Sequence, residues 1–332
     1  IKPSGWRFPM GPGNTVSRFY YTHKPAGSPA MKYAGTPPTG PLPASIDFPM
    51  YRRHEARRFE VICLGDTQTR DVQEVHYLSH DILEDLIGTK AAFGLTLGDV
   101  VFNDLSVFPQ IIPAMSNLDI PWYYVPGNHD HNHDSPVAES TDDTFESYFG
   151  PSYYAYNYGA VHFIVLNDIC YAIGEDKYHG GLGEQQLAFI KNDLSHLSRN
   201  TLVVLMMHIP INELEDCREL YRLLADFPHT FSLSAHTHTQ QHLFIDRVQG
   251  WLQDTPHHHL VHATACGSWW SGTVDERNIP ITTMSDGVPN GYSIITFDKN
   301  RYSVAFRAAH EPADYQMNIA LPESIAAADL GK

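Results

Sequence analysis

Cysteine is scarce in this chain, and the few cysteines stand far apart. The sequence holds four of them, Cys63, Cys170, Cys217 and Cys266, and no pair has C-x-x-C spacing. Since that spacing is typical of zinc sites built from cysteines, the pattern argues against a zinc finger or ribbon. Cys63 lies in an apolar run and is expected to pack as a small hydrophobic residue.

Long apolar runs and basic side chains are scarce too. No run approaches the roughly 20 apolar residues of a membrane span, so the sequence predicts no transmembrane helix. The chain has 22 Lys and Arg against 38 Asp and Glu, a formal net charge of −16. We therefore expect no role in coating nucleic acid, which needs a basic face. A small phosphorylated substrate remains compatible, because bound cations can reverse the field at one site.

The composition indicates a folded globular protein that is long enough to bury a substantial core. Hydrophobic residues make up 42% of the 332 residues and aromatic residues 12%. Residues 1–55 are rich in Pro and Gly and are expected to form an extended arm. Residues 56–250 are predicted to form the main α/β domain, and residues 251–332 a β-rich region packed on it. The oligomeric state stays open.

Strand and helix patterns alternate through the main domain. The predicted strands cover residues 59–64, 92–97, 121–125, 201–207 and 231–235. Helices are predicted from Asp71 to Gly88, over 184–197 and over 213–227, a hairpin turns at Gly159, and a further strand is predicted over 241–245. The segment between the second and third strands is expected to be broken by Pro109 and Pro113. This alternation predicts an α/β fold with a largely parallel sheet, and such sheets bind ligands at the carboxyl ends of their strands.

Five of these strands end in residues of the kinds that ligate metals. Taken alone, each of these residues could instead be a helix cap, a turn residue or a histidine that is hydrogen-bonded within the fold. Five such ends in one sheet are hard to explain in that way, so together they predict a metal site. The residues are Asp66 and Gln68 after the first strand, Asp99 after the second, Asn128 and His129 after the third, His208 after the fourth, and His236 and His238 after the fifth.

In order, type and spacing these residues resemble the calcineurin-like metallophosphoesterases. The resemblance covers about residues 58–245 and implies a four-layer α/β/β/α sandwich that holds two metal ions. It also implies a bridging hydroxide that attacks a phosphate ester in line. By position, one ion would be held by Asp66, Gln68, Asp99 and His238, and the other by Asp99, Asn128, His208 and His236.

One position departs from the family pattern. The first motif is often Asp-x-His, and here Gln68 stands in the third place. An amide oxygen is a harder ligand than imidazole, so this position is expected to favour Mn, Fe or Mg over Zn. His129 is implied as the catalytic acid, while Asp130 would either orient its ring or cap the turn.

Contacts to the substrate are less determined by the sequence. Asn103 and Arg277 are candidates for holding phosphate oxygens, with structural roles as the alternative. Trp269 and Trp270 would stack on a base or an aryl group, or else pack the C-terminal strands onto the core. His257, His258 and His259 are interpreted as structural.

The region after residue 250 resembles the C-terminal part of a bacterial branch of the family. In that branch a small β domain often precedes the catalytic one, and residues 1–6 resemble its tail, so we expect a periplasmic or extracellular protein, with a cytoplasmic one as the alternative. The expected activity is a phosphodiesterase or phosphomonoesterase on a small or lipid-like substrate. The alternative is a non-catalytic binding module with a weakened metal site.

Overall fold

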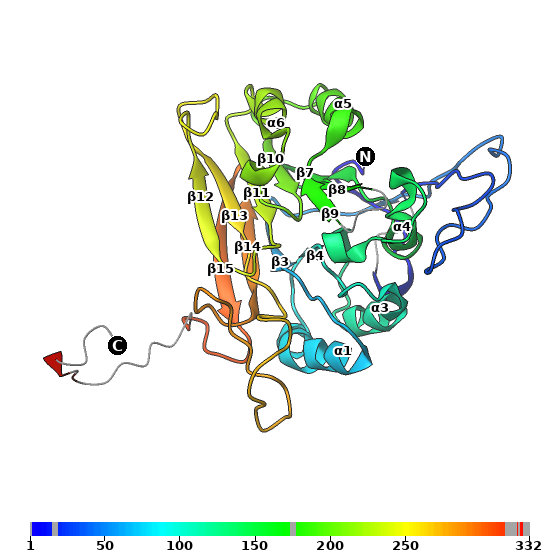
Figure 1. Ribbon diagram of the computed structural model, residues 1–332. Coiled ribbons are helices and arrows are strands. Elements are labelled where there is room, and N and C mark those ends of the chain that lie inside the picture. The colour runs from blue at the N-terminus through cyan, green and yellow to red at the C-terminus, as the bar shows by residue number, and fades with distance from the viewer. Residues whose placement is uncertain (1, 15–18, 173–176, 316–323, 325, 328–332) are drawn as a thin grey trace.

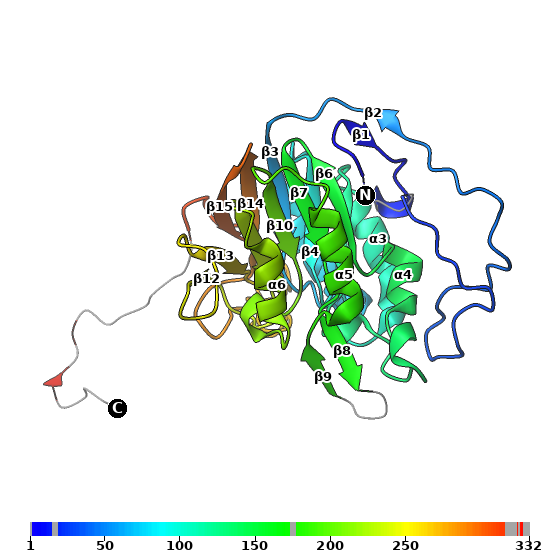
Figure 2. The ribbon, with the colours of Figure 1, turned by 90° about the horizontal axis from the view of Figure 1, so that it is seen from above.

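Two β-sheets packed face to face form the centre of the molecule (Figures 1 and 2). The computed structural model describes residues 2–14, 19–172, 177–315, 324, 326 and 327. One sheet has the strand order β15-β14-β3-β4-β5 and the other β12-β13-β11-β10-β7-β6. With helices on both outer faces, the molecule is the predicted four-layer α/β/β/α sandwich. The strands are β3 (Arg58–Leu64), β4 (Phe93–Leu97), β5 (Trp122–Val125), β6 (Tyr154–Tyr158), β7 (Val161–Val165), β10 (Leu202–Met206), β11 (Thr230–Ser234), β12 (Gln241–Ile245), β13 (His257–Val261), β14 (Gly291–Asp298) and β15 (Arg301–Ala308).

The space between the sheets is filled by apolar and aromatic side chains. Phe93 and Leu95 of β4 belong to the same buried cluster as Phe163 of β7 and Phe231 of β11. Strands such as β10 are buried along their whole length, which explains why they are continuous apolar runs without alternation.

Helices cover the two outer faces (Figure 2). Leu78, Phe108 and Ile111 pack with the outward side chains of the five-stranded sheet, while Ile190 and Leu220 pack with those of the six-stranded sheet. The α-helices are α1 (Val72–Leu78), α2 (Glu84–Leu86), α3 (Phe108–Ser116), α4 (Asp143–Phe149), α5 (Gly183–Leu194) and α6 (Cys217–Leu224), and the short helices are η1 (Pro12–Asn14), η2 (Ser79–Leu83), η3 (Leu105–Val107), η4 (Asn128–Asp130), η5 (Ala138–Ser140) and η6 (Ile211–Glu213).

Local signals placed most helix starts correctly. The Asp71 carboxylate accepts a hydrogen bond from the backbone N–H of Glu74, as its capping position predicts. Two prolines were misleading, because the segment that they were expected to break is helix α3. Pro109 stands at the first turn, where its missing N–H costs nothing, and Pro113 is tolerated inside a helix packed against the core.

The C-terminal region does not form a separate layer on the main domain. Strand β13 pairs in parallel with β11 inside the six-stranded sheet, and β14 pairs antiparallel with β3. The last strands therefore complete both central sheets.

The arm at the N-terminus is tied to the main domain at several points. Strands β1 (Trp6–Arg7) and β2 (Tyr51–Arg52) pair with each other, and Figure 2 shows the arm passing outside α3 and α4. Lys2 is buried and its Nζ lies 2.7 Å from Glu55 Oε1. A further antiparallel pair is formed by β8 (Ile169–Ala172) and β9 (Lys177–Gly180).

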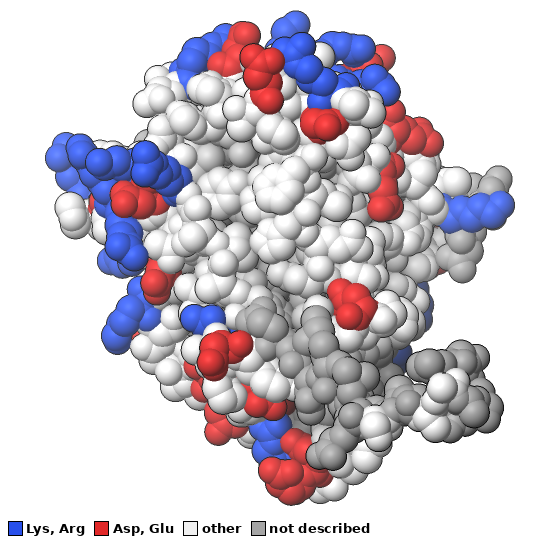
Figure 3. All heavy atoms as spheres, turned by 90° about the vertical axis from the view of Figure 1, so that its left-hand side faces the viewer, with Lys and Arg blue, Asp and Glu red and all other residues white. Residues whose placement is uncertain are grey.

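The surface carries its charges unevenly. On the face beside β12 and β15, the described side chains are mostly uncharged at the centre, with acidic and basic groups around the margin (Figure 3). Within the described residues, no helix is both long and apolar enough to cross a bilayer.

Candidate metal centre

The loops that follow β3, β4, β5, β10 and β11 bring the predicted ligands together. Several of these residues adopt left-handed backbone conformations, among them Gln68 with φ 41°, Asp99 with φ 48° and His236 with φ 69°. Such conformations are unfavourable for residues with a Cβ, and they cluster at functional sites where the surrounding structure holds them.

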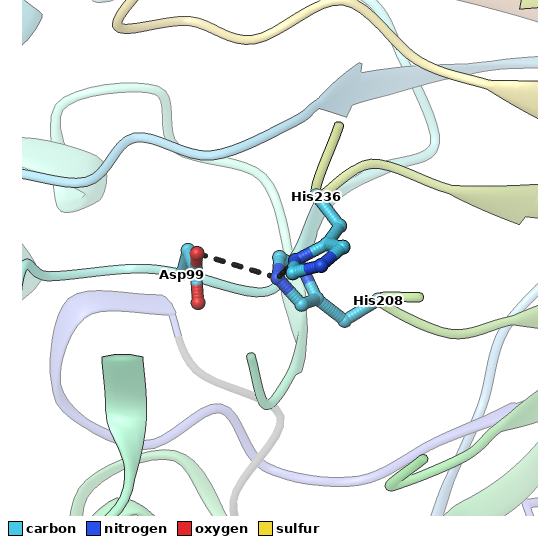
Figure 4. Close-up of side chains that lie close together, drawn as sticks. All are labelled: Asp99, His208 and His236. Atoms are coloured by element: carbon cyan, nitrogen blue, oxygen red, sulfur yellow. Dashed lines mark hydrogen bonds and ion pairs between the residues drawn. The ribbon is translucent and has the colours of Figure 1, made fainter. Parts of the chain in front are cut away.

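His208 Nε2 is the point on which one group of side chains converges (Figure 4). It lies 3.3 Å from Asp99 Oδ2, 3.1 Å from Asn128 Oδ1 and 3.1 Å from His236 Nδ1. Asp99, His208 and His236 each offer a ligand atom, and these atoms lie within 4.8 Å of one another. Two nitrogens, a carboxylate and an amide oxygen around one point form a donor set that suits Mn, Fe, Zn or a similar cation.

The tautomer of His208 is fixed by the backbone. Its Nδ1 lies 2.7 Å from the carbonyl oxygen of Leu97, which can only accept, so Nδ1 carries the proton. The lone pair of Nε2 then points at the cluster. Metal-ligating histidines are commonly held by this kind of bond on the other ring nitrogen.

Asp66 and His238 form the other side of the cluster. His238 Nδ1 donates to the carbonyl oxygen of Gly267 at 2.8 Å, which leaves its Nε2 lone pair free. That Nε2 is 3.2 Å from Asp66 Oδ2, yet this buried oxygen has no partner in hydrogen-bond geometry. A buried carboxylate oxygen and an imidazole lone pair that face each other fit a shared cation.

Gln68 lies between Asp99 and Cys266. Its Nε2 is 3.1 Å from Asp99 Oδ2, and its Oε1 is 3.6 Å from Cys266 Sγ. The predicted ligand is therefore next to the predicted bridging carboxylate.

Electrostatics couples the histidines to the carboxylates. Burial opposes a charge on His208, but the Asp99 carboxylate outweighs it and raises the pKa of His208 to about 10. In the same way, burial is outweighed by the Asp66 carboxylate together with the neighbouring Cys266, which raise the pKa of His238 to about 11. His236 differs, because burial and the nearby His208 lower its pKa to about 4. Protons and cations compete for these lone pairs, so metal binding would release protons.

Two glycines make this close approach possible. A Cβ on Gly98, which has φ +89°, would meet His208 Nδ1 at 2.5 Å, and one on Gly127 would meet the Asp99 nitrogen at 2.1 Å. A residue with a Cβ would clash at either position, so both positions require glycine.

His129 lies beside the cluster and is oriented by Asn103. His129 Nδ1 is 2.7 Å from Asn103 Oδ1 and Nε2 is 3.9 Å from Asp99 Oδ2. The ring also stacks on Phe102 at 4.5 Å. Asn103, predicted to hold phosphate oxygens, is thus in contact with the predicted acid.

Asp130 does not orient the His129 ring. Its buried carboxylate accepts hydrogen bonds from the backbone N–H groups of Gly127, Val100 and Val101. It therefore holds the loops after β4 and β5 together. This contact corrects its assignment as a catalytic residue and supports the turn-capping alternative. Burial raises the pKa of Asp130 to about 8.

Two further candidates for substrate contact have structural partners. Arg277 is paired with Asp81 and Asp275, at 3.0 and 2.8 Å, so the structure does not place its guanidinium among the metal ligands. Trp270 is buried and donates its indole N–H to the carbonyl of Thr67. Both correct the expected substrate roles, because these side chains are held elsewhere.

Trp269 is the exposed member of the tryptophan pair. Its ring centroid is 4.4 Å from that of His238 and 42% of its surface is accessible. Arg70 donates to its backbone carbonyl and lies over the Phe102 ring. The indole therefore lies at the rim of the cluster, and its contact with a substrate stays a prediction.

Several residues that contact the site were not among the predicted ones. They are Arg70, Phe102, Asp168, Tyr178 and Cys266. Asp168 accepts from the backbone N–H groups of His208 and Ile209, so it holds the loop after β10. It stands three residues after the end of β7 at Val165, a position that could have suggested a role at this end of the strands.

Comparisons with known proteins agree with the geometry. The family model described as calcineurin-like phosphoesterase matches residues 59–240, and the model for the C-terminal part of calcineurin-like phosphoesterases matches residues 259–330. Among curated proteins, none matches the chain.

Solved structures show a similar fold. A structure of PhoD is 11% identical, with TM-score 0.53, over 80% of this chain and 69% of that one. A dimetal phosphatase from Danio rerio is 14% identical, with TM-score 0.50, over 75% of this chain and 96% of that one. Because the family model covers more than half of the chain, this protein belongs to the calcineurin-like phosphoesterases and is a metal-dependent phosphoric ester hydrolase.

Proposed function

We propose that this chain hydrolyses phosphodiesters with two bound metal ions. The observation that carries the proposal is the convergence of Asp99, Asn128 and His236 on His208 Nε2. Asp99 also contacts Gln68, and this contact supports a carboxylate that would serve both metal positions. When bound, two divalent cations would lower the pKa of a water molecule and stabilise negative charge on the phosphoryl oxygens.

His129 would handle the proton of the leaving group. Asn103 Oδ1 accepts from Nδ1–H of the ring, so Nε2 is the nitrogen free to exchange a proton. Stacking on Phe102 restricts the ring from its other side. His129 would protonate the departing oxygen, as a general acid does.

The charges near the cluster favour a diester over a monoester. Two divalent cations less the Asp66 and Asp99 charges, and less a hydroxide, leave about one positive charge. A diester carries one negative charge and a monoester up to two. Arg70, the basic group at the rim, is already paired with Glu74 at 2.9 Å and bonded to the Trp269 carbonyl. It is thus poorly placed to balance a second charge.

The exposed Trp269 indole supports a substrate with a flat leaving group. Its backbone has φ 54°, a strained conformation held by the Arg70 bond and by the buried Trp270. Since the His238 ring covers one face of the indole, the opposite, exposed face would take an aromatic base or an aryl group by stacking.

Hydrolysis of bis-p-nitrophenyl phosphate and of p-nitrophenyl phosphate tests this function. The expected result is turnover that depends on added Mn²⁺, Fe²⁺, Zn²⁺ or Mg²⁺, with the diester preferred. Trp269→Ala should raise KM for these aryl substrates more than it lowers kcat. Metal binding without any hydrolysis would favour the alternative, a binding module on the same fold.

A further inference from the structure

The thiol of Cys266 contacts two residues that the sequence assigns to one metal position. Its Sγ is 3.6 Å from Gln68 Oε1 and 4.0 Å from His238 Nδ1. We propose that Cys266 is a positioning residue that sets the orientation of the Gln68 amide and thereby the metal affinity of this position. The proposal rests on the two-metal function above.

Of Gln68 and His238, only Gln68 is available to bond the sulfur of Cys266. The Nδ1 proton of His238 is already donated to the carbonyl oxygen of Gly267 at 2.8 Å. Gln68 Oε1, in contrast, has the Cys266 thiol as its neighbour. The sulfur also lies 3.7 Å from the carbonyl oxygen of Gly267, but this oxygen already accepts from His238 Nδ1 and from the Thr264 hydroxyl. The interaction assigned to Cys266 is therefore the one with the amide.

The Gln68 amide has a different neighbour at each end, Asp99 on one side and Cys266 on the other. Only its oxygen can ligate a cation. Turning Oε1 toward Asp99 and the metal turns the NH₂ group onto the sulfur. A thiol can donate to an amide oxygen or accept from an amide N–H, so Cys266 can partner either end.

Burial makes this partner important. Gln68 is 1% exposed, and its backbone N–H is bonded to the carbonyl oxygen of Asp99 at 2.8 Å. A buried N–H without an acceptor is costly and rarer in proteins than an under-satisfied carbonyl. Removing the sulfur should therefore destabilise the orientation of the Gln68 amide in which Oε1 binds the metal, because the NH₂ group would then lack an acceptor.

Calorimetric titration with Mn²⁺, after dialysis against EDTA, tests the proposal. Cys266→Ala should weaken one of two binding steps by about tenfold, the cost expected for one unsatisfied donor. Cys266→Ser should restore most of this loss, because its hydroxyl can also accept. In Gln68→His, where no amide needs orienting, Cys266→Ala should have little further effect.

Cys63→Ala is the matched control. Cys63 is equally buried but packs between the sheets, so its replacement should lower the melting temperature and leave Mn²⁺ affinity unchanged. Unchanged affinity in Cys266→Ala, or an equal loss in the Gln68→His background, would overturn the proposal. No Mn²⁺ binding by the unsubstituted chain would overturn the two-metal function and this inference with it.

Discussion

Two groups of histidines lie in or beside the same six-stranded sheet and have opposite chemistry. His208 and His238, in the loops after β10 and β11, face carboxylates at 3.3 and 3.2 Å. His257 and His259, on β13, instead face the hydroxyl of Ser232, each at 2.6 Å. The first pair has raised pKa values, while burial lowers those of the second pair.

The contrast shows that neighbours, not residue type, decide what a histidine does. A carboxylate favours either a proton or a cation on the ring, so the loop histidines are suited to metals. A hydroxyl satisfies the neutral ring and leaves no charge to balance, so the β13 histidines are buried packing residues. Substitutions in the two groups should therefore have different effects on metal binding and on stability.

Removing the shared carboxylate should have the largest effect. Asp99→Ala takes away the group that contacts both His208 and Gln68. Because metal ions supply several kcal/mol of transition-state stabilisation, kcat/KM should fall by about 10⁴-fold. Diester hydrolysis and Mn²⁺ titration measure it, with the exposed Asp254→Ala as control. Retention of both metal equivalents would contradict the bridging role.

Changing the predicted acid should affect turnover and spare the metals. His129→Ala should lose about 10²–10⁴-fold in kcat, the usual contribution of a general acid. Mn²⁺ stoichiometry should stay the same, and Asn103→Ala should give a smaller loss because it only frees the ring. If His129→Ala lost a metal equivalent, this residue would be a ligand.

Replacing the amide of Gln68 by an imidazole should make the ligands of the two metal positions more alike. Gln68→His replaces a weak amide ligand, and we expect that position to bind Zn²⁺ about tenfold more tightly. Competition titration against a chromophoric chelator measures the change. Equal Zn²⁺ affinity in both proteins would mean that residue 68 is not a ligand.

The buried histidines near β13 should make the fold sensitive to acid. Burial lowers the pKa of His262 to about 4, against about 6.5 for a free ring. Above pH 6.5 both states are neutral. Below it the unfolded chain takes up a proton that the fold excludes, so stability falls as the pH drops toward 4, by at most about 1.4 kcal/mol per pH unit for each ring.

Urea unfolding at pH 7.5, 6 and 5 measures this effect. His262 Nε2 has no hydrogen-bond partner, so His262→Leu should be tolerated and should make the pH dependence shallower. Replacing the exposed His196 by Gln should leave the slope as it is. An unchanged slope in His262→Leu would show that this ring is not kept neutral by the fold.

Much of the fold was predictable because its signals are local. Strand β12 and the hairpin turned at Gly159 lie where the apolar pattern and the turn residues placed them. Helix α6 is shorter than predicted, because residues 211–213 form a separate short helix before it. Helix α3 was missed because packing against the core outweighs the cost of Pro113.

The partners of the site residues were less predictable, because they come from distant segments. Asp130 bonds residues 29 and 30 positions away, and Arg277 pairs with Asp81, 196 positions away. No sequence pattern links such pairs when only one chain is read. The expected roles of these two residues were corrected for that reason.

Local sequence patterns were enough to predict which residue types end the parallel strands, and hence that candidate metal ligands gather beyond the carboxyl ends of strands from both sheets. Strand alternation and the motif glycines are properties of neighbouring residues, so they are readable without the fold. The contacts of each ligand, in contrast, depend on how distant segments pack together. Gln68 and Cys266 are 198 residues apart, and they meet because the loops after β3 and β13 lie side by side. Their contact depends on packing, which no local pattern encodes.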